Sequence, residues 1–475
     1  DNKQKGSGMR VLKFGGSSVA TPARVRNVTD IILNAVKEEP VVVVVSAFQG
    51  ISNKLLKCAQ LAALGDLSYE NLRNEIIEQH LRTIDELIPT QNDELKLTCD
   101  ALLTELSETL QGIYQLKELT LSAMDLIGSF GERLSTTILA AYINQRYPTQ
   151  YVDARQFIVT DSTHTAANVL FKSTNAAAAE YYEANFQDRP IIPIVTGFIG
   201  KSKEGRTTTL GRNSSDYSAT IIGAALTASR IEIWTDVDGV YSADPHLVSS
   251  AFIQPALSYL EAIELSHFGG KVIHALTLKP VIEKSIPILI KNTLNPGASG
   301  TYIVANTNTV SDKQWNVKSV TAVDDVSLII WKNYKTTDAA HMNERIYRVF
   351  SSIHIQPLIH LEGSPNNNVY IAIKQCDREK VLKALQREFK LEFKHKLVAV
   401  EERHSQCIVA IVGDGMKQLP PDSAGKMFQF LGKMDIQINA IVYGASERNI
   451  CLVIDSGKQV RALNLIHQAF FTDFK

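Results

Sequence analysis

The sequence has 475 residues, of which 45% are hydrophobic and 21% charged, as expected for a soluble globular protein of about three domains. Lys and Arg total 49 against 50 Asp and Glu, so the chain lacks the basic excess that binding to nucleic acid or an anionic membrane requires. The five cysteines form no CxxC pair, and the densest apolar run is too short to cross a bilayer, so we expect a cytoplasmic protein with reduced thiols.

The N-terminal segment predicts a strand, a glycine turn and a helix. Residues 9–14 are strand-like, Gly15 and Gly16 end the strand, and Ser17 or Ser18 is expected to cap a helix over residues 23–37. The run Val41–Val45 then predicts a strand in which every position is apolar. Such a strand has both faces covered, as in a parallel sheet flanked by helices.

The pattern up to about residue 303 indicates one large α/β domain. Residues 69–142 are helical in pattern. Further strands are predicted at residues 151–152, 191–195 and 231–235, and a strand interrupted by proline within residues 281–290. Strands that alternate with helices in this way are typical of α/β folds.

The polar segment at residues 306–312 marks a domain boundary, and a β-α-β-β-α pattern then occurs twice. The first copy has strands near residues 323–331, 369–373 and 396–400 and helices at 340–351 and 378–389; the second has strands at 407–412, 439–443 and 449–454 and helices at 423–431 and 459–470. We therefore predict a catalytic domain at 9–305 and two regulatory modules at 316–401 and 402–475. In this prediction, strands of the second module can also come from the segment that precedes the first module.

The segment KFGGSS, starting at Lys13, favours a phosphate site. Two glycines let the backbone approach a ligand, a helix N-terminus offers free N–H groups, and Lys13 adds a positive charge. An ordinary strand-to-helix turn with a solvated lysine explains the same residues.

The segment TTLGRNSSDYSA at residues 208–219 is dense in hydroxyl groups and glycine and leads into an apolar helix at 219–226. Arg212 can bind a carboxylate through both of its terminal nitrogens, and Asp216 can accept from an ammonium group or orient groups around a phosphate. A capped helix with an Arg212–Asp216 pair four residues apart remains the alternative.

Two later segments complete the candidate site. WTDVDGVYSADP brings Thr235 and Asp236 to the end of a strand, where open α/β sheets bind ligands, although an acidic turn fits too. HFGGKVIH supplies Lys271 beside two glycines. His267 and His274 would share one face of a helix, and a zinc site would need further ligands that the sequence does not offer. Motifs of P-loop, Rossmann and nucleophile-elbow enzymes are absent from the sequence.

Seven segments occur in the order and at the spacing of a known family. They are KFGGSS at Lys13, VSAFQGISN at Val45, GERLS at Gly131, TGFIG at Thr196, LGRNSSDYSA at Leu210, WTDVDGVYSADP at Trp234 and FGGKVIH at Phe268. Together they resemble the amino acid kinase superfamily and, within it, the aspartate kinases, whose paired ACT domains the C-terminal repeat resembles. The resemblance implies a carbamate kinase-like three-layer α/β/α catalytic domain followed by two ferredoxin-like ACT modules.

The resemblance also implies a reaction. The γ-phosphate of ATP would pass to the side-chain carboxylate of L-aspartate, the first step toward lysine, threonine and methionine, with Mg²⁺ held mostly through the nucleotide phosphates. That carboxylate is already a nucleophile at neutral pH, so catalysis needs positioning and charge neutralisation and no general base.

Roles for single residues follow only from this resemblance. Lys13 and Lys271 would stabilise the phosphates, and Asp216 would orient Lys13 or the substrate. For the substrate, the implied residues are Ser46, Ser52, Glu132 at the α-ammonium, Arg212 at a carboxylate, and Asp216. For the nucleotide, they are Lys13, Gly15, Gly16, Ser17, Thr235, Asp236, Tyr241, Asp244 and Lys271. The chain departs from the family pattern at Ser52, where Thr is frequent, at His246, where Arg is usual, and at Ala275, where Pro is usual.

Several questions stay open at the level of sequence. A related kinase for acetylglutamate, glutamate or a nucleotide monophosphate is disfavoured by GERLS and the ACT-like tail. A regulatory protein with an inactive kinase domain is disfavoured by the intact Lys13, Arg212, Asp216 and Lys271. The chain can also be the kinase part of a bifunctional enzyme, for example one fused to homoserine dehydrogenase. Lysine and threonine are both candidate effectors, expected near residues 338–343 and 359–362, and a homodimer or homotetramer is expected to form through the ACT modules.

Overall fold

The computed structural model describes residues 8–211, 214–270, 273–310, 316–334, 339–363, 368–418, 421–443 and 448–471. The chain folds into two compact units. The first unit comprises Asp1–Val240, Pro255–Tyr259 and His274–Val310; the second comprises Tyr241–Gln254, Leu260–Ile273 and Ser311–Lys475. Two stretches of the predicted catalytic domain therefore fold with the C-terminal modules.

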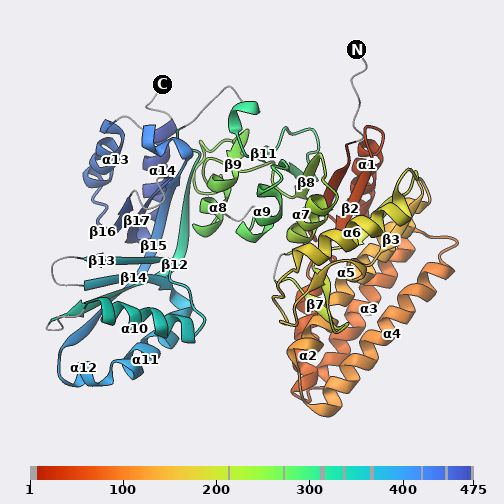
Figure 1. The fold of residues 1–475 in the computed structure, drawn as a ribbon, viewed down its shortest axis with the longest axis horizontal. Coiled ribbons are helices and arrows are strands. Elements are labelled where there is room, and N and C mark those ends of the chain that lie inside the picture. The colour runs from red at the N-terminus through yellow and green to blue at the C-terminus, as the bar shows by residue number, and fades with distance from the viewer. Residues whose placement is uncertain are drawn as a thin grey trace. The chain divides into compact units, whose positions relative to one another are not determined.

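The first unit is built on an eight-stranded sheet with the order β3-β5-β2-β1-β8-β10-β11-β9 (Figure 1). Its strands are β1 Arg10–Phe14, β2 Val41–Val45, β3 Thr149–Val152, β5 Ile192–Thr196, β8 Arg230–Thr235, β9 Ala256–Ser258, β10 Ile288–Asn292 and β11 Thr301–Val304. All neighbours are parallel except β10 and β11. β1 and β2 are buried at every position, as their apolar sequences predict.

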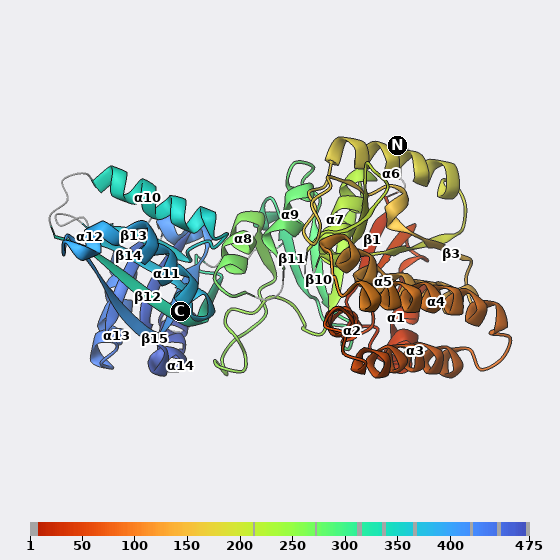
Figure 2. The same ribbon diagram turned by 90° about the horizontal axis from the view of Figure 1, so that it is seen from below.

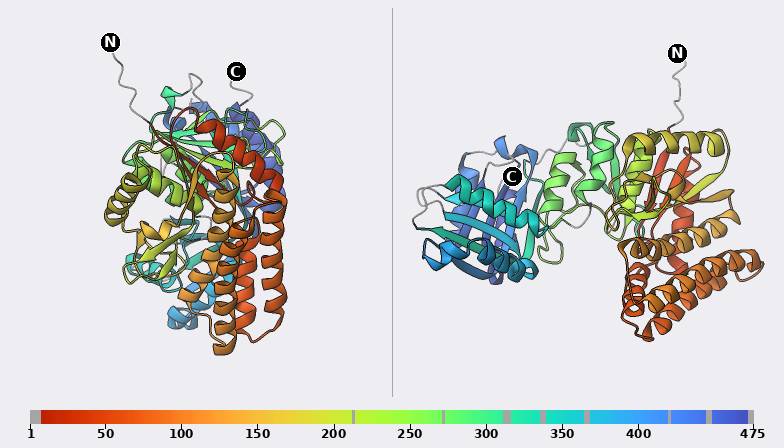
Figure 3. Two further views of the ribbon diagram at one scale, coloured as in Figure 1. Left: turned by 90° about the vertical axis from the view of Figure 1, so that its right-hand side faces the viewer. Right: turned by 60° about the horizontal axis from the view of Figure 1, so that its bottom comes forward.

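Helices cover both faces of this sheet. On one face, a core joins β1 and β2 to α1 Pro22–Ala35, α2 Ile51–Ala63, α3 Ser68–Leu87, α4 Asp93–Leu116 and α5 Leu121–Asn144. The long helices of this group lie side by side in Figure 3. Val43 and Val45 face that core, whereas Val42 lies beside α6 Phe171–Phe186 and α7 Ser215–Ala225. The predicted three-layer α/β/α fold is confirmed.

Smaller elements complete the first unit. They are α9 Ala275–Ile282, the short helices η1 Ala154–Gln156 and η2 Thr307–Thr309, and a three-stranded sheet of β4 Val159–Thr160, β6 Ile199–Ser202 and β7 Thr207–Thr209. β6 and β7 form an antiparallel pair. The chain leaves β7 directly toward the segment that contains Arg212.

Two local predictions are wrong. The cap of α1 is Thr21, whose hydroxyl accepts from the Arg24 N–H, and neither Ser17 nor Ser18; Pro22 at the first helical position suits this later start. The apolar residues 281–282 end α9, which contains Pro280, and the strand begins only at Ile288.

The second unit contains a six-stranded sheet with the order β13-β14-β12-β15-β17-β16. Its elements are α8 Tyr259–His267, most of which belongs to this unit, β12 Ser319–Asn333, α10 Ala339–Ser352, β13 Ile359–Gly363, β14 Asn368–Lys374, η3 Gln375–Asp377, α11 Arg378–Glu388, α12 Lys390–Lys394, β15 Val398–Val412, η4 Asp414–Gln418, α13 Pro421–Lys433, β16 Ile438–Tyr443, β17 Asn449–Asp455, η5 Ser456–Lys458 and α14 Gln459–Phe471. The predicted β-α-β-β-α repeat is present, and Figure 2 shows α10 and α11 beside the strands of its first copy.

The longest strands of the two copies, β12 and β15, pair with each other in antiparallel orientation. β12 and β15 pair along most of their length, with register shifts between Val323 and Leu328. The two strands predicted near residues 396–400 and 407–412 are therefore one continuous strand. One core packs α10 and α11 on the first half of the sheet, another packs α13 and α14 on the second, and a third joins strand residues of both halves.

Candidate active site

The centre of the site is an ion pair at the carboxyl end of β1. Lys13, buried in the middle of the sheet, lies with its Nζ 2.6 Å from Oδ1 of Asp216 in the first turn of α7. The carboxyl ends of parallel strands are where such sheets bind ligands. Asp216 thus has a cation partner in Lys13; Arg212, the alternative partner considered from the sequence, lies outside the described residues.

The glycine turn after β1 brings two loops together. The Gly15 N–H donates to the Trp234 carbonyl at 3.3 Å, and a Cβ on Gly15 would lie 3.3 Å from the Lys13 Nζ. A Cβ on Gly16 would lie only 2.8 Å from the Ala47 carbonyl oxygen. Glycine at these positions therefore leaves room for the ammonium group and for close approach of the loop that follows β2. Ser17 is partly buried in the same turn.

Glu132 on α5 is the most unusual group of the site. Its side chain is buried, its Oε1 accepts from the Ala47 N–H at 3.2 Å, and its Oε2 has no hydrogen-bond partner among the described residues. Burial raises the pKa of Glu132 to about 8. The hydrogen bond from Ala47 and the charge of Lys13 act in the opposite direction and lower this pKa. A buried carboxylate with one free oxygen is costly unless a ligand supplies a donor, so Glu132 marks a place for a cationic group.

The loop after β2 holds the two predicted serines. The Ser46 N–H donates to the Phe14 carbonyl at 3.1 Å, and the Ser46 carbonyl accepts from the hydroxyl of Ser135 at 2.8 Å. Ser52 is the second residue of α2, which begins after Gly50 with a φ of +82°. Both serines are partly buried, and Ser46 is anchored to β1 and to the helix that carries Glu132.

The predicted nucleotide residues are divided between the units. Thr235 ends β8 and donates from its hydroxyl to the exposed carboxylate of Asp236 at 3.2 Å. Tyr241 and Asp244 belong to the second unit, where the Asp244 carboxylate accepts from the His246 N–H at 2.9 Å and so caps a turn. Lys271 lies outside the described residues.

A second buried carboxylate, Asp125, was not predicted from the sequence. It accepts from the Thr209 hydroxyl at 2.5 Å and from the Thr165 N–H at 3.0 Å, and it pairs with the His164 Nδ1 at 2.6 Å. Asp125 precedes Glu132 by seven residues on α5, so the two share a helix face. That spacing is the signal that could have found it.

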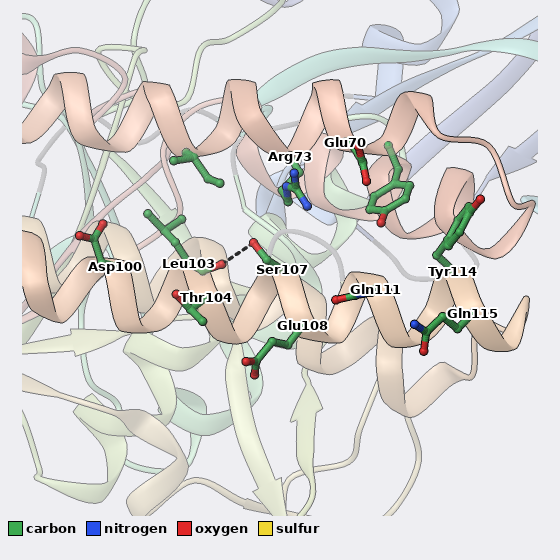
Figure 4. Close-up of a pocket in the computed structure, with 12 residues that line it drawn as sticks. Glu70, Arg73, Asp100, Leu103, Thr104, Ser107, Glu108, Gln111, Tyr114 and Gln115 are labelled. Carbon is green, nitrogen blue, oxygen red and sulfur yellow. Dashed lines mark hydrogen bonds between the residues drawn. The ribbon is translucent and has the colours of Figure 1, made fainter.

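A groove of about 670 Å³ lies elsewhere, between α3 and α4 (Figure 4). Its lining includes Tyr69, Arg73, Asp100 and Glu108, and no residue of the Lys13–Asp216 site. The three acidic residues of the lining, Glu70, Asp100 and Glu108, are exposed to solvent, so none has the burial that perturbs Glu132. We place the active site at the strand ends, not in this groove.

Two absences hold for the part of the chain that the structure describes. No cluster of three or more His, Cys, Asp or Glu side chains could hold a metal ion, and no helix combines the length and apolar character needed to cross a bilayer. The predicted shared helix face of His267 and His274 is wrong, because α8 ends at His267 and His274 caps the start of α9.

Comparisons with known proteins agree with this geometry. The model of the amino acid kinase family matches residues 8–292, and an ACT domain model matches residues 409–470. The chain is 34% identical to a bifunctional aspartokinase/homoserine dehydrogenase of Haemophilus influenzae over 98% of its own length, but spans just 57% of that relative. It is 32% identical to the chloroplastic aspartokinase 1 of Arabidopsis thaliana, covering 97% of this chain and 80% of the relative.

The fold has close counterparts among solved structures. Aspartokinase III of Escherichia coli, solved with aspartate and ADP, superposes with a TM-score of 0.81 at 24% identity, covering 98% of this chain and all of the other. Its complex with lysine and aspartate gives a TM-score of 0.79. The chain belongs to the amino acid kinase family and, within it, to the aspartokinases.

Proposed function

We propose that this chain transfers the γ-phosphoryl group of ATP to the side-chain carboxylate of L-aspartate, giving 4-phospho-L-aspartate and ADP. The observation that carries the proposal is the buried Glu132: its Oε2 has no hydrogen-bond partner among the described residues, and the charge of Lys13 acts on its pKa. An amino acid substrate brings the ammonium group that this oxygen lacks. Arg212 is proposed to bind the substrate carboxylate at the other end.

Beyond binding aspartate, the phosphoryl transfer requires positioning of the nucleotide and neutralisation of negative charge. Asp216 holds the Lys13 ammonium at the strand end, where its charge can offset the negative charge of the phosphoryl group in the transition state. Thr235 and Asp236 are proposed to bind the nucleotide, together with Tyr241, Asp244 and Lys271. We also propose that Mg²⁺ would be held mostly through the nucleotide phosphates and would neutralise part of their charge.

The substrate assignment predicts a specific product. With ATP, Mg²⁺ and L-aspartate, the purified chain should form an acyl phosphate that hydroxylamine traps as aspartyl hydroxamate. N-Acetylglutamate and glutamate should give none, because Glu132 needs a free α-ammonium and the site is proposed to fit the shorter side chain. Hydroxamate from either of them, with none from aspartate, would move the chain to another kinase of the family.

We also propose that the second unit senses an amino acid. In its first copy, the Tyr347 hydroxyl contacts the His360 Nδ1 at 2.7 Å and so links α10 to β13, where an effector is expected. Part of the predicted effector segment, including Asp338, lies outside the described residues. The ends of the sheet, β13 and β16, are proposed to take part in a homodimer or homotetramer, because an uncovered edge strand can pair with another chain.

If the second unit senses an amino acid, lysine or threonine at millimolar concentration should inhibit the kinase activity. Linkage requires that aspartate or ATP weakens effector binding by the same factor as the effector weakens theirs. Initial rates over a grid of substrate and effector concentrations would measure this. If neither amino acid, alone or combined, changed the rate, the second unit would have to serve assembly only.

A further inference from the structure

We propose that His467, in the last helix of the chain, is a positioning residue for the nucleotide: it holds in place the segment that carries Tyr241 and Asp244. Both of these residues are proposed to bind ATP, so the inference rests on the proposed function and deepens it. His467 and the segment belong to the same compact unit. The inference assigns this role to a buried imidazole that lies outside the seven sequence motifs.

The ring of His467 contacts two serines of one segment, one at each nitrogen. His467 is 1% exposed; its Nε2 lies 2.9 Å from the Ser242 hydroxyl oxygen, and its Nδ1 lies 3.2 Å from the Ser250 hydroxyl oxygen. Two phenylalanine rings flank it, with centroids 6.2 Å away for Phe252 and 4.6 Å away for Phe471. One side chain of α14 therefore holds the segment at two points.

The hydrogen bonds around Ser242 indicate which nitrogen of the ring carries the proton. The Phe252 N–H donates to the Ser242 hydroxyl oxygen at 3.0 Å, so the hydroxyl hydrogen can donate to the His467 Nε2. The ring proton then lies on Nδ1 and is donated to the Ser250 hydroxyl. Burial lowers the pKa of His467, which favours this neutral form. Both ring nitrogens and the Ser242 hydroxyl then have partners, and a buried network with all its partners in place favours one geometry.

The backbone next to the Ser242 side chain is fixed as well. The Ser242 N–H donates to the Phe252 carbonyl at 2.8 Å, and the Ser242 carbonyl accepts from the Val320 N–H at 2.8 Å. The neighbouring Tyr241 carbonyl accepts from the Ser319 hydroxyl at 3.0 Å. The backbone of Tyr241 is therefore bound to β12 directly, and to α14 through the side chain of the next residue.

Asp244 lies within the stretch that the two serines delimit. Its carbonyl accepts from the N–H groups of Leu247 and Val248 at 3.0 Å and 2.9 Å, so the turn has a defined internal shape. The contacts of His467 hold this turn at both ends. Because a small displacement of a binding group can cost a large factor in affinity, loss of these contacts should weaken nucleotide binding. Aspartate binding at Glu132, which belongs to the first unit, should be unaffected.

The test measures the Kd of ADP with Mg²⁺ by calorimetry and the KM values of ATP and aspartate, all on the full chain. His467→Leu removes both ring contacts and keeps an apolar side chain in the core. We expect it to raise the ADP Kd and the ATP KM about tenfold and the aspartate KM less than twofold. His467→Gln can still accept from the Ser242 hydroxyl through its Oε1, so it should recover most of the lost affinity.

Ser327→Ala is the matched control. Ser327 is also a buried serine of the second unit, but its hydroxyl has no hydrogen-bond partner among the described residues. Its replacement should leave the ADP Kd and both KM values within about twofold of wild type.

The outcomes separate this inference from the proposed function. A wild-type chain that binds no ADP refutes both. A wild-type chain that binds ADP but forms no aspartyl hydroxamate refutes the substrate assignment alone, and the ADP Kd values then decide the role of His467. An unchanged ADP Kd in a folded His467→Leu chain, or an equal weakening of ADP and aspartate binding, refutes the positioning role. If His467→Leu does not fold, Ser242→Ala decides: an ADP Kd raised about threefold or more, the scale of one lost hydrogen bond, supports the role, and an unchanged Kd refutes it.

Discussion

Replacing Lys13 by methionine should lower kcat by about 10²-fold or more while the chain stays folded. Methionine keeps much of the side-chain volume at this buried position and removes only the charge. Because the negative charge on the transferring group must be balanced in the transition state, the loss should fall on kcat more than on either KM. Single-turnover rates with saturating ATP and aspartate would measure it directly.

Two further variants show whether the loss of kcat in Lys13→Met comes from the missing positive charge at this position. Lys13→Arg keeps a positive charge beside Asp216 but changes its shape, so it should recover only part of the rate. Lys37→Ala is a control for general loss of a lysine, since Lys37 is exposed and donates a hydrogen bond to Asn34 on the surface of α1. A Lys13→Met enzyme with a kcat within threefold of wild type would show that the Lys13–Asp216 pair is structural.

Elements with a single, strong local signal were predictable from the sequence. Val41–Val45 contains only β-branched apolar residues, and a short run of this kind favours a strand buried on both faces. The C-terminal repeat was also predictable, because its amphipathic helices recur in the same order between apolar strands. α10 and α13 have wide apolar faces directed at separate cores.

Errors arose where tertiary contacts outweigh the local pattern. The polar residues between Val400 and Cys407 suggest a loop, yet they continue β15 because β12 pairs with them. Ion pairs from Lys332 to Glu401 and from Arg378 to Glu402 accompany this pairing. Charged side chains can occupy a strand in this way when neighbouring elements supply their partners, which the local sequence does not reveal.

In the candidate active site, too, residue types were predictable from local sequence, whereas contacts between distant segments were not. Its motif residues were predictable as types of chemistry, but the contact between Lys13 and Asp216 joins segments about 200 residues apart. Gly131, next to Glu132, packs closely against Ala47, where a Cβ would lie 2.7 Å from the Ala47 side chain, and this contact between α5 and the loop after β2 is not visible in the sequence. Asp125 belongs to no recognised motif, and only the fold brings Thr209 and His164 to it.

Replacing Glu132 by glutamine should have opposite effects on substrate binding and on stability. Glutamine cannot neutralise an ammonium group, so the aspartate KM should rise about 10²-fold, the scale of a lost hydrogen bond between charged groups. In the wild-type chain, Glu132 must release a proton before it can bind the ammonium, because its pKa is about 8 without substrate. The aspartate KM of wild type should therefore fall as the pH rises from 6 toward 8, and that dependence should be absent from Glu132→Gln.

The stability effect follows from the same pKa. Since the folded chain holds the Glu132 proton up to a pH of about 8, whereas an unfolded chain releases it near the ordinary value of 4.5, wild-type stability falls as the pH rises between these values. Glu132→Gln removes this loss, so its Tm without ligands should exceed that of wild type by at least about 2 °C at pH 8, with a smaller difference at pH 5. Glu232→Gln is the matched control: Glu232 is also buried but pairs with Arg10 and Arg230, so its replacement should lower the Tm. A Glu132→Gln chain that melts below wild type at pH 8 and binds aspartate normally would mean that Glu132 holds the fold together and does not bind the substrate.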